Sequence, residues 1–344
     1  MSEKARRSYA DLKFNGVSVT VDLKNQLEKI SYTDVADGES DSVELTVQNI
    51  GLKWMTSWRP AFGDTISGSM NYEHWYNAKT KPLKVDLGTL CIDSIKYDGQ
   101  RGGTATIGAL SIPANTAWKT QIRTKTWENA TLQQIGQEIA GRYGMSLTYE
   151  ADTVSIASVE QTQETDSEFL YKQCQDHNLA MKVFQKKIII YDKGTWEAKA
   201  AITTIDIKDF ESDWTINDTI QGIYTGARVA YKPAKAKKEM SVFVGFVGES
   251  DPHARNLKVT ETCDSEADAR KKGIAAVNAA NEQATTLSGS IFPDPRIVAG
   301  VCVTLSGFGK NYDGKWFVDK SKQTISGSDG ATQDIELHKV QKRL

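Results

Sequence analysis

Two six-residue stretches, far apart in the chain, share one pattern: Gly88–Asp93 reads GTLCID and Gly314–Asp319 reads GKWFVD. Each has the form Gly-x-apolar-apolar-apolar-Asp. Each is followed by an Asp-Gly pair, at Asp98–Gly99 and Asp329–Gly330, and then by a further strand-like run. Asp-Gly between two such runs is typical of a β-hairpin, because glycine accepts the positive φ that these turns need. We therefore predict a β-hairpin of the same design in each half of the chain.

A similar strand precedes the pattern in both places. Thr65–Gly68 (TISG) comes before the first copy and Thr304–Gly307 (TLSG) before the second. The second copy has five more residues between its Asp and its turn, so the hairpin arms differ in length. Three matches in the same order predict an internal duplication of a β-barrel or β-sandwich. The alternative is that two hairpins with glycine turns resemble each other by chance.

Strand-like alternation continues through both outer thirds of the chain. Apolar and polar residues alternate in Tyr9–Leu23 and Ser42–Val47, as in half-buried strands. In the final third, strands are predicted at Gly226–Tyr231, Ser241–Val244 and Val301–Leu305. One helix interrupts them, beginning at Asp264 or Ser265 and ending near Ala284. Its inward face is expected to carry Ala267, Ile274 and Val277, with Arg270, Lys271 and Lys272 outward.

The middle of the chain has a different pattern, which begins after a break at Ile112–Asn115. Thr131–Gln134 and Thr165–Glu168 are both capping boxes, in which the first side chain and the fourth satisfy each other's backbone N–H groups. Each box predicts a helix, the first ending at Gly144 and the second near Asn178. The first helix is expected to bury Leu132, Ile135, Ile139 and Tyr143, and the second Phe169, Leu170, Cys174 and His177.

A strand pair is predicted after the second helix. Ala180–Phe184 and Ile188–Tyr191 are apolar and flank a tight turn at Lys186–Lys187. Lys193–Ala200, rich in Ala and Lys, is interpreted as a linker. The complete pattern predicts an α+β, mainly β fold with three domains: residues 1–115 as a β-barrel or sandwich, 116–200 as an αβ insert, and 201–344 as a second barrel with an inserted helix.

The composition is that of a globular protein. The chain has 344 residues, 42 Lys and Arg against 44 Asp and Glu, a formal net charge of −2, and 39% hydrophobic residues. This length predicts two or three domains. The near-neutral charge argues against a dedicated nucleic-acid binder. The basic start at Met1–Arg7 leads into no hydrophobic stretch, and no apolar run approaches the ~18 residues of a membrane span, so we expect neither a secretory signal nor membrane insertion.

Neither the cysteines nor the histidines form a metal motif. The cysteines (Cys91, Cys174, Cys263 and Cys302) include no C-x-x-C pair, so we expect all four to be reduced and mostly packed, in a cytoplasmic compartment. The histidines (His74, His177, His253 and His338) show no H-E-x-x-H pattern. Asn311–Gly314 has part of a calcium-loop pattern without its terminal Glu, and we interpret it as a turn. No metal, cofactor or catalytic residue is therefore predicted.

Three features have a possible functional interpretation and an ordinary structural one. A glycosidase needs two carboxylates across a sugar, and Glu160, Glu164, Asp166 and Glu168 cluster; Asp166 and Glu168 fit better as charges at a helix start. Trp54 and Trp58 suit either an aromatic platform for sugars or bases, or packing onto a sheet, which we favour. The basic loop Lys232–Lys238 suits either phosphate contact or simple solvation, which we also favour.

The middle segment resembles a known family. Gln161–Leu170 (QTQETDSEFL), followed by a helix through Cys174 and the apolar run Ile188–Ile190, is similar to the insert of the baseplate central hub proteins of contractile phage tails, the late control protein D family. Thr131–Gly136 (TLQQIG), which leads to Tyr143–Gly144, opens the same segment.

The end of the chain also resembles this family. Leu287–Pro293, Gly300–Val301 and Gly307–Val318 look like its closing barrel. The resemblance spans roughly Tyr9–Val340 and is most specific in the insert. The loop Lys232–Lys238 matches no feature of the family.

Membership of this family would imply two tail-tube-like barrels in each chain and a homotrimer. Three chains would then form a ring of six similar units, which meets a sixfold tail tube on one face and a threefold spike on the other. The implied partners are the tail spike protein, the tail tube or tube-initiator protein and other baseplate proteins. The implied place is the virion tail baseplate, assembled in the host cytoplasm, and the implied role is structural, without enzymatic activity.

Two other functions remain open on the sequence. The chain is alternatively a cell-wall-acting or glycan-binding tail component, with its site in the insert or near Trp54 and Trp58. It is alternatively the spike-base part of a secretion-system puncturing device. The lack of a β-helical needle repeat before Leu344 counts against a complete device of this kind.

Overall fold

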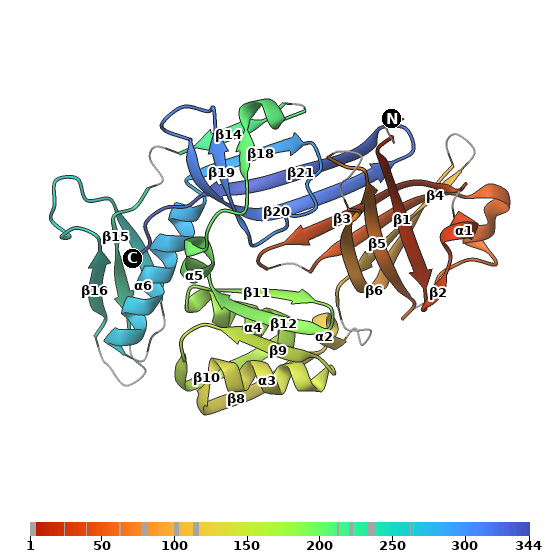
Figure 1. The fold of residues 1–344 in the computed structure, drawn as a ribbon. Helices are drawn as coiled ribbons and strands as arrows, with labels where there is room; N and C mark the ends of the chain where they lie inside the picture. The colour runs from red at the N-terminus through yellow and green to blue at the C-terminus, as the bar shows by residue number, and fades with distance from the viewer. Residues whose placement is uncertain are drawn as a thin grey trace.

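The computed structural model describes residues 5–23, 25–38, 40–61, 63–76, 81–99, 103–112, 117–211, 213–219, 223–232, 238–261, 263 and 265–344. The fold is α+β and mainly β, as expected, with several sheets. We describe four parts (Figure 1): the N-terminal β module (5–112), the insert (117–200), the C-terminal β module (201–219 and 285–344) and a side module (223–284) that interrupts the latter. The predicted break at Pro113–Asn115, and with it the first domain boundary, lies outside the described residues.

The N-terminal β module is built from seven strands and two short helical segments within its described residues. The strands run in the order β3-β4-β7-β6-β5-β1-β2, each antiparallel to its neighbour. Its core side chains are almost fully buried, and each contributes about 1.5–3 kcal/mol of hydrophobic stabilisation; among them are Ile30, Leu45, Met70, Leu87, Leu90 and Ile107. The elements are β1 (Arg7–Phe14), β2 (Val17–Ser18), α1 (Thr20–Leu23), β3 (Leu27–Val35), β4 (Ser42–Gln48), η1 (Ile50–Met55), β5 (Thr65–Glu73), β6 (Leu83–Asp98) and β7 (Thr104–Leu110).

The insert packs two helices against two small sheets. Both predicted capping boxes are confirmed: Thr131 caps α3 with Gln134, and Thr165 caps α4 with Glu168. The predicted strand pair is also confirmed, although its turn is at Gln185–Lys186, one residue earlier than expected, where both residues have positive φ. The elements are α2 (Ala117–Thr120), β8 (Ile122–Thr131), α3 (Leu132–Arg142), β9 (Ser146–Glu150), β10 (Ser155–Thr165), α4 (Asp166–Asp176), β11 (Leu179–Phe184), β12 (Lys187–Asp192) and α5 (Lys193–Ala198).

The final third contains two sheets rather than one. Gly226–Tyr231 and Ser241–Val244, predicted as strands of the second barrel, belong to a separate three-stranded sheet on which the helix α6 packs. Local alternation does not say which sheet a strand joins, so this side module could not be recognised from the sequence pattern. Its elements are β15 (Gly226–Tyr231), β16 (Met240–Gly245), β17 (Asn256–Glu261) and α6 (Glu266–Glu282). The C-terminal β module consists of β13 (Thr204–Asp206), η3 (Ile207–Asp209), β14 (Thr215–Asp218), β18 (Thr285–Ile291), β19 (Cys302–Ser306), β20 (Gly314–Ser326) and β21 (Gly330–Lys339).

The two β modules share one continuous sheet. Residues Lys320–Ser326 of β20 pair antiparallel with Lys29–Val35 of β3, so the sheet runs without interruption from β14 to β2. Figure 1 shows β20 and β21 reaching across from the C-terminal module to β3. We call the β3·β20 pairing the seam.

The repeated pattern forms the same structure twice. In both modules its strand is the middle of an antiparallel meander, β5-β6-β7 in one and β19-β20-β21 in the other. The Asp that ends the pattern is skipped in both registers: Asp93 forms a β-bulge between Ile92 and Ser94, and Asp319 forms one between Val318 and Lys320. A bulge at the same position of both strands supports the predicted duplication, because bulges are specific features of a fold rather than defects.

The match of the preceding strands needs a correction of two residues. Thr65 pairs with Cys91, and the residue opposite the equivalent Phe317 is Cys302 rather than Thr304. The same hydrogen bond precedes each pair, from Ile92 N to Asp64 O and from Val318 N to Val301 O, both 2.9 Å. A shift of two residues keeps the same side chains on the buried face, which is why the sequence pattern did not reveal it.

Other local expectations differ from the structure for identifiable reasons. The run Tyr9–Leu23 is not one strand, because Asn15 and Gly16 have φ of 48° and 80° and turn the chain between β1 and β2. The expected linker at Lys193–Ala200 contains α5, which is capped by the Asp192 side chain on Thr195 N (2.6 Å). Ala267, expected to face inward, is exposed, because it lies in the first turn of α6. None of the helices in the described residues is long and apolar enough to cross a membrane.

Candidate assembly interface

The seam is held by side chains as well as by the backbone. The Ser31 and Thr324 hydroxyls lie 3.0 Å apart across it, and the Tyr72 hydroxyl donates to Gln323 Oε1 at 2.7 Å. All four side chains are buried, so these polar groups depend on one another for hydrogen bonds. A buried polar group that loses its hydrogen-bond partner costs about 1–3 kcal/mol, so these contacts favour this pairing of β3 with β20 over others.

The loop between β18 and β19 closes the seam on one side. The Trp75 indole N–H donates to Pro293 O (2.5 Å), and the Trp75 ring stacks on Phe292 with centroids 4.9 Å apart. Arg6 lies over the other side of this contact, 4.9 Å from the Phe292 ring centre. Phe292 and Pro293 therefore belong to the C-terminal module by sequence but contact the N-terminal module.

A buried charge group fixes the insert to both β modules. Lys182 of β11 forms ion pairs with Asp34 (2.6 Å) and Asp41 (3.3 Å), both of the N-terminal module. The second oxygen of Asp34 accepts a hydrogen bond from Ala299 N (3.0 Å) of the C-terminal module. Asp34 of the N-terminal module thus binds both the insert and the C-terminal module. Its removal would leave the buried Lys182 with Asp41 as its ion-pair partner.

A second charged network surrounds Glu197 of α5. His338 of β21 lies between Glu197 (Nε2 to Oε1, 3.1 Å) and Asp319 (Nδ1 to Oδ1, 2.8 Å). Arg343 binds the other side of Glu197 through Nε (2.8 Å) and also contacts Glu282 of α6 (2.5 Å). Lys193 continues the network from Glu282 (3.2 Å) to Asp37 (3.0 Å). The network joins the insert, the side module and both β modules.

This network shifts the pKa values of its members. Burial lowers the pKa of His338, but the neighbouring Asp319 and Glu197 carboxylates outweigh it and raise the pKa to about 9. Burial raises the pKa of Glu197, but hydrogen bonds from His338 and Arg343 and their charges outweigh it and lower the pKa to about 2. At neutral pH, His338 is therefore an imidazolium between two carboxylates, a structural charge rather than a proton-transfer group.

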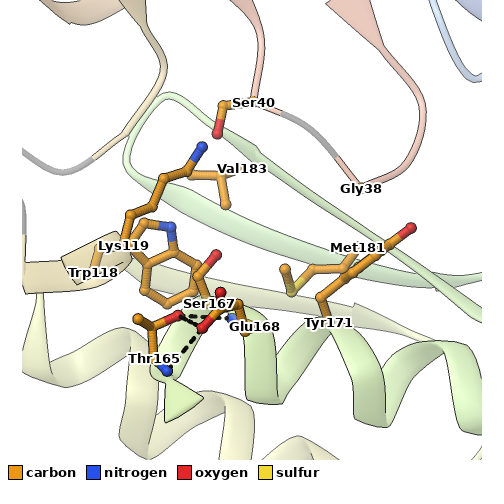
Figure 2. A pocket seen from close by; sticks show the side chains of 10 residues that line it. All are labelled: Gly38, Ser40, Trp118, Lys119, Thr165, Ser167, Glu168, Tyr171, Met181 and Val183. Carbon is orange, nitrogen blue, oxygen red and sulfur yellow. Dashed lines mark hydrogen bonds between the residues drawn. The ribbon is translucent and has the colours of Figure 1, made fainter. Parts of the chain in front are cut away.

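A pocket of about 270 Å³ lies where the turn at residues 36–41 meets the insert (Figure 2). Gly38 N donates to Met181 O (2.9 Å), and a Cβ on Gly38, whose φ is +80°, would lie 2.7 Å from the Tyr171 hydroxyl. The one carboxylate among the lining residues, Glu168, is bonded to Thr165 in the helix cap. The carboxylate of the pocket is therefore engaged in the helix cap. The lining residues are Gly38, Ser40, Trp118, Lys119, Thr165, Ser167, Glu168, Tyr171, Met181 and Val183.

The carboxylate cluster of the insert is not arranged as a catalytic pair. Asp166 is fully buried and forms an ion pair with Arg142 (3.0 Å). Burial raises its pKa, but hydrogen bonds from Gln161, Tyr143 and Arg142 outweigh this, so the pKa is lower than usual. Glu168 caps α4, as predicted, and its bonds to Thr165 lower its pKa. Glu160 is exposed and Glu164 half-buried, the latter 3.7 Å from Lys172.

The remaining sequence candidates are in structural positions or outside the described residues. Trp54 and Trp58 meet edge to face at 82°, with Trp54 in the core, so they do not form a flat platform, although both line a pocket of about 450 Å³. Most of the Lys232–Lys238 loop lies outside the described residues. The four cysteines are buried thiols. Asn311–Gly314 is a turn in which Asp313 accepts from Phe308 N (2.8 Å). The described residues contain no group of three His, Cys, Asp or Glu side chains suited to a metal ion.

The residues that join the parts of the molecule were not found from the sequence. Asp34, Lys182, Glu197 and Arg343 lie in four different segments, and their contacts depend on long-range packing. One local signal was available for Glu197, because Asp192 three residues before Thr195 is a helix N-cap pattern.

Solved structures with the same fold come from phage tails and related machines. The tail protein from Neisseria meningitidis MC58 is 11% identical and superposes with a TM-score of 0.69 over 96% of each chain. The 43 kDa tail protein of prophage MuSo2 from Shewanella oneidensis is 12% identical, with a TM-score of 0.68 over 96% of this chain and 98% of that one. An Escherichia coli component of the type VI secretion system, described as similar to T4 phage tail proteins, is 9% identical, with a TM-score of 0.58 over 96% of this chain and 77% of that one.

These likenesses establish the fold. No family model matches the sequence, and no curated protein matches it either. The chain therefore has the fold of phage tail proteins and of a type VI secretion component along nearly its whole length.

Proposed function

We propose that this chain is a structural component of a phage tail or phage-like contractile particle: the central hub of the baseplate, which forms a trimeric ring between the sixfold tail tube and the threefold spike. The observation that carries the proposal is the pair of β modules, which repeat one meander and one bulge and are joined by strand pairing. The shared fold with phage tail proteins supports it.

The duplication supplies the symmetry that such an adaptor needs. Three chains with two similar modules each present six similar units around one axis, while the insert and the side module occur only three times. One face then suits a sixfold tube and the other a threefold spike. Closed rings form when a head-to-tail contact repeats through a rotation that returns to the start.

The resemblance of the insert to the late control protein D family supports the finer parts of this proposal. It favours the tail spike protein, the tail tube or tube-initiator protein and other baseplate proteins as partners, and the virion baseplate as the location. We also propose three domains close to the expected limits at 115/116 and 200/201, with the side module as a further unit within the third.

We propose a purely structural role without enzymatic activity, in preference to a cell-wall-acting component. The insert carboxylates are engaged in a helix cap and in ion pairs, and the Trp54 and Trp58 rings meet edge to face. Clearing of purified peptidoglycan by the protein, abolished by Asp166→Asn or Glu168→Gln in a variant that still folds, would contradict this.

The test of the hub role is assembly. We expect the purified chain to have three times the monomer mass of 38.0 kDa by light scattering, alone or after addition of the spike protein encoded beside it. Negative-stain images should show a ring with six outer lobes, capped by the tube protein on one face and by the spike on the other. A stable monomer or dimer in the presence of both partners would overturn the proposal.

A second candidate is the spike-base part of a secretion-system puncturing device. The shared fold with a type VI secretion component favours it. The same images discriminate between the two, because a puncturing device would recruit a needle and a secretion tube rather than the phage tube protein.

A further inference from the structure

The middle strands of the two modules have different neighbours beyond their matching bulges. Past Asp319, β20 leaves β19 and its residues 320–326 pair with β3 across the seam. Past Asp93, β6 leaves β5 in the same way, but its residues 94–97 pair with β7 on one side and with no strand on the other in the described part of the chain. Ser94–Tyr97 is therefore the equivalent of the β20 edge in the seam, without a neighbouring strand among the described residues.

The C-terminal module has the matching free strand. β14 pairs with β18 in the way that β3 pairs with β4, and on its other side it meets no strand among the described residues. Following the registers through β18, β21 and β20 places Ile216 at the position of Tyr32, and Asp218 at the position of Asp34. Each module thus has a first strand (β3 or β14) and an edge on its middle strand (β6 or β20) that can pair with the first strand of another module. Within one chain, only β3 and the β20 edge are paired in this way among the described residues.

Residues at the two open strands are more exposed than their equivalents in the seam, as expected for an interface that is not yet covered. In the seam, Ser321 and Gln323 are buried, whereas the equivalent Ile95 and Tyr97 of β6 are half-buried. Ile30 of β3 is fully buried, whereas the equivalent position next to β14 is Trp214, which is 39% exposed. An open edge with apolar side chains is a liability that native proteins cover.

The loops beside these edges differ in the same way: one is covered at the seam and the other is exposed. In the loop between β18 and β19, Pro293 and Ala299 form hydrogen bonds to the N-terminal module. The equivalent loop between β4 and β5 contains η1, which is held next to the β6 edge by a hydrogen bond from the Tyr97 hydroxyl to Trp54 O (2.7 Å). η1 carries three large apolar side chains that are exposed: Ile50 at 57%, Leu52 at 55% and Met55 at 47%. A cluster of this kind marks an interaction surface.

We propose that β14 of one protomer pairs antiparallel with Ser94–Tyr97 of β6 in the next protomer, with Tyr97 opposite Ile216 and Lys96 opposite Asn217. The junction repeats between chains the seam that exists within each chain, and Trp214 and the η1 side chains become covered at it. This inference rests on the proposed ring and specifies its contact, since six modules close a ring only if the seam and this junction alternate.

Cross-linking tests the register directly. Strands paired in this way bring opposite Cα atoms to about 4.5–5.5 Å, which is within disulfide range. We expect Lys96→Cys combined with Asn217→Cys to form an intermolecular disulfide on mild oxidation, giving a covalent trimer in a non-reducing gel. The native cysteines are buried, so they contribute little background.

Two further pairs serve as controls. Thr33→Cys with Lys322→Cys occupies the equivalent positions in the seam and should form a disulfide within one chain. Lys84→Cys with Asn217→Cys should form none, because Lys84 lies in the half of β6 that pairs with β5. Ile50→Asp should weaken association about tenfold or more while leaving the unfolding midpoint of the monomer unchanged, because this side chain is exposed in the single chain.

The outcomes separate this junction from the ring itself. A trimer by light scattering without the 96–217 disulfide, in a sample where the 33–322 disulfide forms, overturns the junction and leaves the ring. The 96–217 disulfide in open chains of other lengths supports the junction and overturns the trimer. Neither a trimer nor the disulfide, at high protein concentration and with the spike protein present, overturns both.

Discussion

In the C-terminal β module the far half of the middle strand β20 is covered by β3, and in the N-terminal β module the matching half of β6 is open. The order of the five strands β3-β4-β7-β6-β5 matches β14-β18-β21-β20-β19, and the bulge lies at the same place in both. A second difference lies between the first two strands: a short turn joins β3 to β4, whereas residues 219–284, with the side module, lie between β14 and β18. The comparison teaches that one design serves two environments, and that the differences lie where other parts of the molecule attach.

The largest expected effect compares the cores of the two modules. Trp316 and Leu90 occupy the same position of the repeated pattern, and both are fully buried. Trp316→Ala should lower the free energy of unfolding by about 3–5 kcal/mol and Leu90→Ala by about 2–5 kcal/mol, because each leaves a cavity. Because the modules share one sheet, urea unfolding followed by fluorescence should show one transition for both variants. Two separate transitions would show that the seam does not couple them.

The next comparison concerns the Asp that occupies the same place in β3 and β14. Asp34→Ala should cost about 3 kcal/mol, since Lys182 keeps only Asp41 and Ala299 N loses its acceptor. Asp218→Ala should cost about 1 kcal/mol, because within the described part of the chain Asp218 accepts hydrogen bonds from the hydroxyls of Thr285 and Tyr312 alone, both at 3.1 Å. Thermal unfolding of the two variants under the same conditions checks the order. Equal losses of stability would contradict the view that the ion pair with Lys182 makes Asp34 more important than Asp218.

The pH dependence of stability distinguishes the two bulges, because only Asp319 has a histidine partner. The pKa of His338 is raised to about 9 in the folded chain, compared with about 6.5 in an unfolded one. The stabilisation, of order 3 kcal/mol, is therefore complete below about pH 6.5 and is lost as the pH rises through about 9. Urea midpoints measured across this range should fall with pH in the wild type.

A neutral substitution provides the control for this pH dependence. His338→Gln keeps hydrogen-bonding groups but cannot be charged, so its midpoint should change much less between pH 6.5 and 9. Glu197 does not interfere, because its pKa of about 2 means that its stabilisation is lost only on acidification. A wild type with no slope in this range would contradict the charged imidazolium.

The smallest expected effect is at the other bulge. Asp93 has the same backbone position as Asp319 but is exposed. Asp93→Ala should change the free energy of unfolding by no more than about 0.5 kcal/mol. A loss comparable to that of Asp319→Ala in the same assay would show that the carboxylate itself is needed to form the bulge.

Local features were predictable from the sequence and long-range pairings were not. The capping boxes at Thr131 and Thr165 depend on residues three apart, and both helices begin where predicted. The repeated pattern located the middle strand of each meander, but the offset of two residues before it leaves the same face buried and so is invisible in the pattern. The seam depends on Ser31 and Thr324, which are 293 residues apart, and nothing near either one indicates the other.

The candidate interface was predictable only in its general form. The duplication and the hub resemblance led us to expect related modules, but the exposed Ile50, Leu52 and Trp214 look like core residues in the sequence. Their role follows from which edges are already occupied, and this depends on the folded chain.

The β3·β20 pairing also decides how the molecule responds to force. Seven consecutive residues of one strand, Lys320–Ser326, are bonded to the neighbouring module, while the beginning of the same strand lies in its own module. A hinge between the modules would have to peel these bonds apart one after another. The two modules are therefore expected to move as one rigid unit, so that any bending within the chain takes place in the parts attached beside them.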